Sequence, residues 1–219
     1  MDFRKILPIL GVLVVAAAAV LFYKNYAGNG APEGPAPPSA ESLLTVTADD
    51  IVLGSPDAPV TIFEYASLTC PHCAHFTLDT LPRLKAEYID TGKVKLVFRD
   101  FPLDTWALKA SMLAHCAGPE RFYGFLDVLF HNQPQWSRAE DPAAALAGIA
   151  KMGGMGSEAF ERCMNDDALS QRISKTRFDA EKALTIQSTP TFFVNGEELV
   201  GSQPYEAFQA AIEKSQPGP

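Results

Sequence analysis

The pattern of apolar and polar positions predicts a strand, a helix and a second strand between residues 60 and 101. Residues 60–70, VTIFEYASLTC, are rich in β-forming residues and end in a small-residue turn, which indicates a strand. A helical pattern then begins at a cysteine pair and stops at Gly92. Pro82 lies inside this helix, so we expect a kink or a break there. In residues 93–101, KVKLVFRDF, apolar and charged residues alternate as in a strand, which completes a βαβ unit.

The following part of the chain, residues 105–184, changes to a helical pattern. Apolar residues recur there at helical spacing, and no strand signal interrupts them. Dipeptides that contain proline or glycine divide the block, because these residues interrupt helices. The predicted helices are residues 105–117, 119–132, 141–152, 156–165 and 167–184. We therefore expect an all-helical insertion.

A strand pattern returns after Pro190, in the stretches TFFVNG and ELVG. The turn Asn195-Gly196 between them is a strong hairpin signal, and an amphipathic helix, YEAFQAAIEKS, follows. The element order is βαβ, helical block, ββα, which predicts a single α/β domain with a helical insertion. The expected divisions are residues 46–104 for the first part of the domain, 105–184 for the insertion and 185–219 for the second part.

The N-terminal residues have a different character. Residues 6–23 form an uncharged apolar run behind the basic start MDFRK, and at 1.5 Å per residue the run reaches about 27 Å. Residues 1–24 are therefore predicted to be a signal-anchor or a cleaved signal peptide, and the sequence leaves the choice open. Positive charge before the run favours a chain that lies outside the cytoplasm, on the periplasmic side of the inner membrane. Residues 28–40 are rich in proline, glycine and alanine, so residues 25–45 are predicted to be a flexible linker, with folding expected from about Leu44.

Composition and charge narrow the function. The chain is 47% hydrophobic and 20% charged, which excludes a disordered protein. The whole chain has a net charge of −8, and residues 1–24 carry +2 of it. The remaining residues therefore carry −10. This acidic balance argues against nucleic acid as a partner, because binding to phosphates needs a basic face. An exported chain can keep disulfides, which makes the spacing of its four cysteines informative.

Cys70-Pro71-His72-Cys73 lies where the first strand gives way to the helix. This junction places the Cys70 sulfur over the first helical turn, near free amide hydrogens and the positive end of the helix dipole. Protonated His72 would add a second positive charge, so we expect a depressed Cys70 pKa. A stabilised thiolate makes the disulfide a stronger oxidant, and Cys73, one turn deeper, can resolve a mixed disulfide.

Other uses of the pair remain open on the sequence. A metal-binding or metal-delivery module could use Cys70, Cys73 and a histidine, although no second C-x-x-C motif completes a familiar zinc site. Candidate further ligands are His72, His75, His115 and Cys116. Covalent haem would need a histidine at position 74, which is alanine. A purely structural bridge would close a ring too small to constrain the unfolded chain much. We predict no metal and no cofactor.

Three stretches together resemble the DsbA family of exported thiol-disulfide oxidoreductases: EYASLTCPHC from Glu64, FRDFPL from Phe98 and STPTFFVNG from Ser188. The resemblance covers about residues 46–214 and implies a thioredoxin-like fold with a helical insertion. It also implies that Thr189-Pro190 is a cis-proline loop that faces the cysteines and binds an extended substrate.

By the same resemblance, Glu64 is a buried acid that exchanges protons with Cys73. The alternative is a solvated charge near a strand end. Cys116 and Cys163 fall in two different helices of the insertion. They are either a structural disulfide, worth about 4 kcal/mol for a loop of about 48 residues, or two buried free thiols.

The sequence therefore predicts a monomeric, membrane-tethered enzyme that donates its Cys70-Cys73 disulfide to exported proteins. Unfolded or reduced exported proteins would be its substrates, and a membrane partner would reoxidise it. A disulfide reductase or isomerase of the same fold is the alternative within the enzyme class. The linker leaves no room for the dimerisation domain of an isomerase, and Pro-His between the cysteines argues against a reductase.

Overall fold

A computed structural model describes residues 20–21, 23–24 and 37–216 of the chain. The chain divides into two units, Met1–Pro37 and Pro38–Pro219, and the second holds the fold described below. Most of the predicted membrane segment, residues 6–23, lies outside the described residues. Within the part that is described, none of the helices combines the length and the apolar composition needed to cross a membrane.

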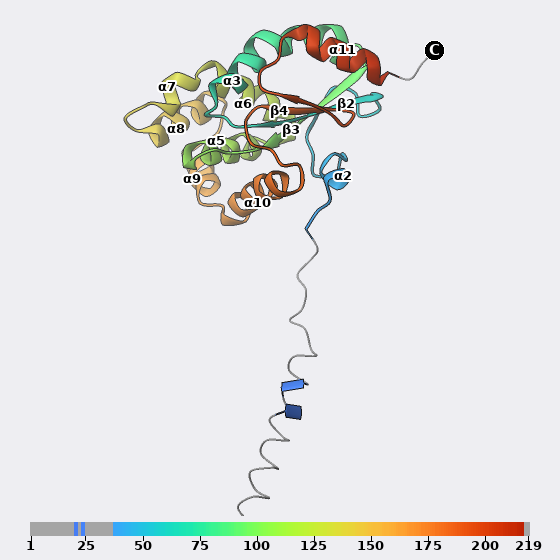
Figure 1. Cartoon of the computed structure of the whole chain (residues 1–219). Coiled ribbons are helices and arrows are strands. Elements are labelled where there is room, and N and C mark those ends of the chain that lie inside the picture. Colours follow the sequence, from blue (N-terminus) through green and yellow to red (C-terminus); the bar gives the residue numbers. More distant parts are fainter. Residues whose placement is uncertain (1–19, 22, 25–36, 217–219) are drawn as a thin grey trace, which may run out of the picture. The chain divides into compact units, whose positions relative to one another are not determined.

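A five-stranded sheet forms the centre of the second unit (Figure 1). The strands are β1 (Val52–Leu53), β2 (Val60–Ala66), β3 (Val94–Asp100), β4 (Thr191–Val194) and β5 (Glu197–Val200). Their order is β1-β3-β2-β4-β5, with β2 and β3 parallel and the other pairs antiparallel. The predicted βαβ and ββα units are thus both present, and β2 lies at the centre, where its residues are covered on both faces.

One continuous helical run, residues 71–89, connects β2 to β3. Its segments are α3 (Pro71–His75), the π-helical η1 (Phe76–Thr80), α4 (Leu81–Leu84) and the π-helical η2 (Lys85–Ile89). Pro82 does not break the run, although a break was one of the two outcomes that the sequence predicted. It lies in α4 between the two π-helical segments, whose wider turns can accommodate a residue without an N–H group.

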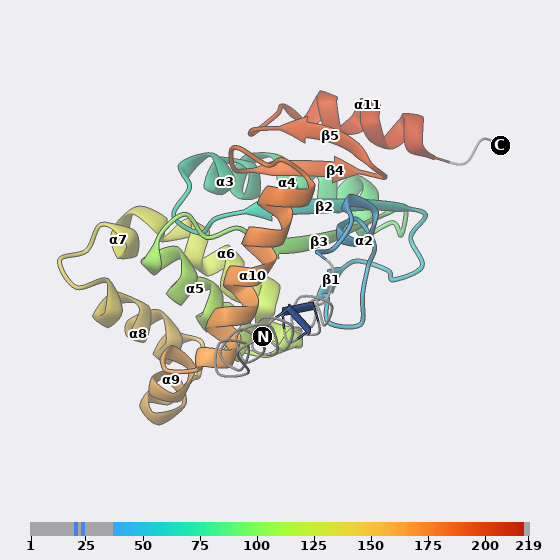
Figure 2. The ribbon, with the colours of Figure 1, turned by 60° about the horizontal axis from the view of Figure 1, so that its bottom comes forward.

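The block between β3 and β4 is helical, as predicted. Its helices are α5 (Thr105–Cys116), α6 (Pro119–His131), α7 (Gln133–Ser137), α8 (Pro142–Met152), α9 (Ser157–Met164) and α10 (Asp167–Ala183). The short helix α7 was not predicted, because Pro134 looked like a break and instead occupies the first turn, which tolerates proline. Figure 2 shows α5 to α9 beside the sheet and α10 running across it.

Helices cover both faces of the sheet. The helical run after β2 and the C-terminal helix α11 (Tyr205–Ser215) pack on one face, where Ile62 and Phe192 lie with Phe208. On the opposite face, Ala180 of α10 packs against Tyr65. Alternate residues of β2 therefore point into two different parts of the core.

The folded unit begins earlier than the predicted linker boundary at residue 45. Helix α2 (Ala40–Leu43) starts at Ser39, whose side chain accepts a hydrogen bond from the backbone of Ser42. The Leu43 carbonyl accepts hydrogen bonds from the Tyr65 hydroxyl at 2.9 Å and from the Arg99 guanidinium at 3.3 Å. Residues 38–45 thus belong to the folded unit, because capping and these two bonds attach them to the sheet.

Candidate active site

Cys70 lies at the end of the β2–α3 connection and faces a loop that is distant in sequence. It is the N-cap residue of α3, and Pro71 follows at the first helical position, where the missing N–H costs no helical bond. The Cys70 thiol donates a hydrogen bond to the Thr189 carbonyl oxygen over 3.2 Å. The Thr189-Pro190 peptide bond is cis. The fold therefore brings the cysteine pair and the predicted proline loop together.

The surroundings of Cys70 stabilise its thiolate. A hydrogen bond from the Cys73 thiol is the largest cause that lowers the pKa of Cys70, to about 5, and it acts against the cost of burial. The Thr189 side chain and the backbone N–H groups of Cys73 and His72 contribute further hydrogen bonds. At neutral pH a group with this pKa is almost wholly ionised, so Cys70 is a nucleophile without an added base.

His72 and Thr189 contribute through different atoms. The His72 side chain is exposed, and its backbone N–H is the group that stabilises the thiolate. The predicted charge contribution of the imidazole is not among the causes of the lowered pKa. Thr189 is buried, and its hydroxyl has no hydrogen-bond partner within the described residues while Cys70 is a neutral thiol. Ionised Cys70 gives this hydroxyl an acceptor.

The pKa values of Cys73 and Glu64 are raised, whereas that of Cys70 is lowered. Cys73 is fully buried, and burial, followed by its hydrogen bond to Cys70, raises its pKa well above the usual range. Glu64 in β2 is only 2% exposed, so the alternative of a solvated charge is wrong. Burial, and secondarily the charge of Cys70, raise the pKa of Glu64 to about 8. Both groups therefore hold a proton at neutral pH beside an ionised Cys70.

A cavity of about 320 Å³ adjoins Glu64. Apolar side chains such as Leu96 and Phe130 contribute to its lining, together with Lys85 and Asp127. Lys85 and Asp127 are exposed, so the cavity extends from the buried carboxyl group toward solvent. One carboxylate oxygen of Glu64 has no hydrogen-bond partner in the described part of the chain. The cavity thus adjoins Glu64 on a side that the cysteines do not line.

Two polar contacts fix the segment that precedes Cys70, and the sequence did not indicate either of them. Gln133 of α7 is 5% exposed, and its Nε2 donates to the carbonyl oxygens of Leu68 and Cys70, both at 2.9 Å. The Thr69 hydroxyl donates to Asp104 at 2.6 Å. Glutamine is usually a surface residue, so no local pattern distinguishes Gln133.

The second cysteine pair belongs to the helical insertion. Cys116 of α5 and Cys163 of α9 form a disulfide with a Cα–Cα distance of 6.1 Å, rather than two free thiols. It joins two helices of the insertion, while Cys70 and Cys73 are free.

Three of the four residues proposed as further metal ligands, His75, His115 and Cys116, are engaged elsewhere. His75 forms a hydrogen bond of 2.9 Å with the Ser202 hydroxyl, and His115 forms one of 2.6 Å with Asp100. Within residues 37–216, no three histidine, cysteine or acidic side chains gather as a metal site would require. The metal-delivery alternative therefore has no third ligand beside the pair in this part of the chain.

The chain is similar to known disulfide-forming proteins. A family model described as Thioredoxin matches residues 46–214. A protein-disulfide oxidoreductase of Rickettsia bellii is 37% identical over 174 residues, which cover 78% of this chain and 66% of the relative, just under two thirds of its length. Disulfide bond formation protein D of Bacillus subtilis is 29% identical, and the match covers 76% of this chain and 77% of that protein.

Solved structures agree with the sequence comparisons. The crystal structure of Wolbachia pipientis alpha-DsbA1 is 34% identical and superposes with a TM-score of 0.76, covering 80% of this chain and 95% of that one. The family match over residues 46–214 includes the sheet, the insertion and the cysteine pair. The chain therefore belongs to the DsbA family of protein-disulfide oxidoreductases, which have a thioredoxin-like fold.

Proposed function

We propose that this protein introduces disulfide bonds into exported proteins through the Cys70-Cys73 pair. The observation that carries the proposal is the unequal protonation of the pair within one buried site. Cys70 has a pKa of about 5, whereas the pKa of Cys73 is raised. The interactions that stabilise the Cys70 thiolate are lost when the pair forms a disulfide, so the oxidised pair is a strong acceptor of electrons.

The reaction balances as two thiol-disulfide exchanges. A substrate thiolate attacks Cys70 Sγ of the oxidised pair, a substrate–Cys70 disulfide forms, and Cys73 leaves with the electron pair and takes up a proton. A second substrate thiol loses its proton and attacks the substrate sulfur of the mixed disulfide, which releases Cys70 as a thiolate. The substrate loses two electrons and gains a disulfide, and the enzyme gains the two electrons.

Glu64 is the proposed proton donor to Cys73 in this cycle. Its pKa of about 8 keeps it protonated at neutral pH, and Cys73 needs a proton when it leaves the disulfide. The cavity beside Glu64 lets the carboxyl group recover its proton from solvent. Pro71, which starts helix α3, and the backbone of His72 keep the Cys70 sulfur at the helix start.

The substrate would bind as an extended chain at the Thr189-Pro190 loop. The Thr189 carbonyl lies 3.2 Å from Cys70 Sγ, so a backbone group paired with this loop would be next to the attacked sulfur. We further propose a periplasmic, extracytoplasmic site of action, a tether formed by residues 6–23, a monomeric state and a membrane partner that reoxidises the dithiol. The disulfide formation relatives support this direction of electron flow.

The proposal is tested with a reduced, unfolded protein as substrate and the full chain as enzyme. We expect oxidised enzyme to form disulfides in it and Cys70→Ser to form none. In Cys73→Ser, Cys70 is first loaded with glutathione as a mixed disulfide, and a peptide with one thiol should then displace the glutathione. The Cys70–peptide disulfide should accumulate and be detectable by mass spectrometry, because neither Cys73 nor a second peptide thiol can attack it. Titration in glutathione buffers gives the reduction potential of the pair, which distinguishes an oxidase from a reductase. A reduction potential near that of thioredoxin, about −270 mV, would favour a reductase and contradict the proposal.

A further inference from the structure

Among the described residues, Gln133 is the one side chain that donates to both carbonyls flanking residue 69, next to the nucleophile. Its amide nitrogen lies 2.9 Å from the oxygens of Leu68 and Cys70. Both partners are acceptors only, so the NH₂ end of the amide must face them, and both of its hydrogens are used. Within the described part of the chain, no other group donates to the Leu68 oxygen. Loss of Gln133 would leave that buried oxygen without a partner.

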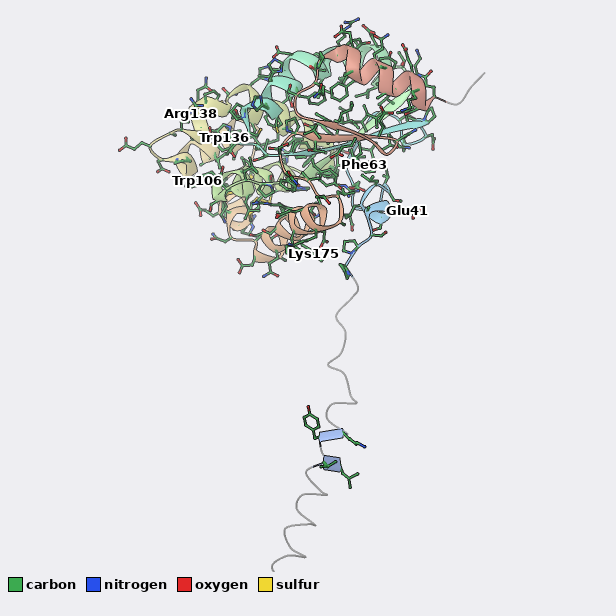
Figure 3. The ribbon with its side chains drawn as sticks, viewed as in Figure 1. Glu41, Phe63, Trp106, Trp136, Arg138 and Lys175 are labelled. Carbon is green, nitrogen blue, oxygen red and sulfur yellow. A yellow bond between two sulfur atoms is a disulfide. The ribbon has the colours of Figure 1, made fainter. Side chains whose placement is uncertain are left out.

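Helix α7 holds Gln133 firmly in this position. Trp136, one turn further along and labelled in Figure 3, is 1% exposed, and its indole Nε1 donates to the Leu129 carbonyl at 2.8 Å. The α7 backbone is thus fixed to α6 by a buried hydrogen bond and a large apolar side chain. Gln133 therefore connects the rigid helical insertion to the loop that carries Cys70, 63 residues earlier.

We propose that Gln133 is a positioning residue that holds the backbone around Cys70 so that the sulfur faces its hydrogen-bond donors and the Thr189 loop. The donors that stabilise the thiolate include the backbone N–H groups of His72 and Cys73, whose directions depend on the Cys70 peptide. The two Gln133 hydrogens also place partial positive charge on carbonyls that would otherwise repel the thiolate. The inference rests on the proposed function and deepens it: the insertion sets how strongly the pair oxidises.

The test compares Gln133→Met with Gln135→Met in the full chain. Methionine keeps the length of the side chain and removes the donors, while Gln135 is exposed on the same short helix. We expect Gln133→Met to raise the midpoint of thiolate absorbance by about one pH unit and to shift the glutathione equilibrium about tenfold toward the oxidised pair. Gln135→Met should leave both unchanged. An unchanged midpoint in folded Gln133→Met would overturn the inference, even if its melting temperature falls, because a purely structural role predicts that outcome.

A second measurement, on the wild-type protein, tests the inference if Gln133→Met does not fold. In the wild-type protein, the side-chain amide signal of Gln133 in nitrogen-15 spectra should shift with a midpoint near pH 5, as Cys70 ionises. A signal that does not move across that range also overturns the inference. Failure of the proposed function would be seen in a separate experiment, as wild-type enzyme that does not oxidise a reduced protein. The two titrations test only the role of Gln133.

Discussion

Replacement of Glu64 by glutamine should stabilise the protein, and by more as the pH rises. The pKa of Glu64 is about 8 in the folded chain and 4.5 as an ordinary value. Between these values the unfolded chain loses the Glu64 proton and the folded chain keeps it, so the contribution of Glu64 to stability falls with rising pH. The cost at pH 5 is about 1 kcal/mol and at pH 7 about 3 kcal/mol. Glutamine cannot ionise, so the variant avoids this loss.

The measurement is urea unfolding at pH 5 and pH 7, followed by tryptophan fluorescence. The variant should exceed the wild type by about 2 kcal/mol more at pH 7 than at pH 5, whatever constant difference the amide introduces. In the oxidised protein the effect should have the same sign and a smaller size, because bridged Cys70 carries no charge. Glu198→Gln, on the exposed side of β5, is the matched control and should show no such difference. An equal gap at both pH values for Glu64→Gln would refute the burial argument.

Three further predictions concern the cysteines. Alkylation of Cys70 by iodoacetamide should be half-maximal near pH 5 while Cys73 stays unmodified at neutral pH, and peptide mapping that finds a midpoint at an ordinary thiol pKa would contradict the site geometry. Thr189→Val removes a donor to the thiolate and should raise that midpoint; a value still near 5 would show that the hydroxyl has no part. Replacement of Cys116 and Cys163 together by alanine should lower the free energy of unfolding by about 4 kcal/mol in urea titrations and leave the Cys70 midpoint in place.

The sequence was sufficient for the features that depend on local pattern. The change of period at Cys70 located the strand-to-helix junction, and Asn195-Gly196 located the β4–β5 hairpin, where both residues have positive φ. The five longer helices of the insertion were found because each has its own apolar period, whereas the short α7 was missed. These features need no knowledge of distant residues, since backbone geometry and burial of one face determine them.

Features that depend on distant contacts were not accessible. β2 is buried on both faces, so no alternation distinguishes Glu64 from a solvated residue. Helix α2 is too short to show a periodic pattern of apolar residues. Hydrogen bonds from Tyr65 and Arg99 attach it to the sheet. Gln133 acts on Cys70 only because α7 packs beside it. Pairing between segments far apart in sequence decides each of these cases.

The protonation of the site also determines how the reduction potential changes with pH. In the reduced state at pH 7, Cys70 carries the single negative charge, while Cys73 and Glu64 hold protons. A second charge in the same buried site would face burial cost and repulsion together. Oxidation therefore removes two electrons and one proton, the latter from Cys73.

One proton for two electrons gives a potential that falls by about 30 mV per pH unit between pH 5 and 8, against about 60 mV below pH 5, where Cys70 is protonated too. Glu64 should steepen the slope near pH 8, because loss of the Cys70 charge on oxidation removes one of the two causes that raise its pKa. Glu64→Gln should keep the shallower slope through that region. Glutathione titrations at several pH values measure both slopes. A slope of about 60 mV at pH 7 in Glu64→Gln, where Glu64 cannot contribute, would mean that Cys70 is protonated there, and the thiolate on which the proposed oxidase depends would be absent.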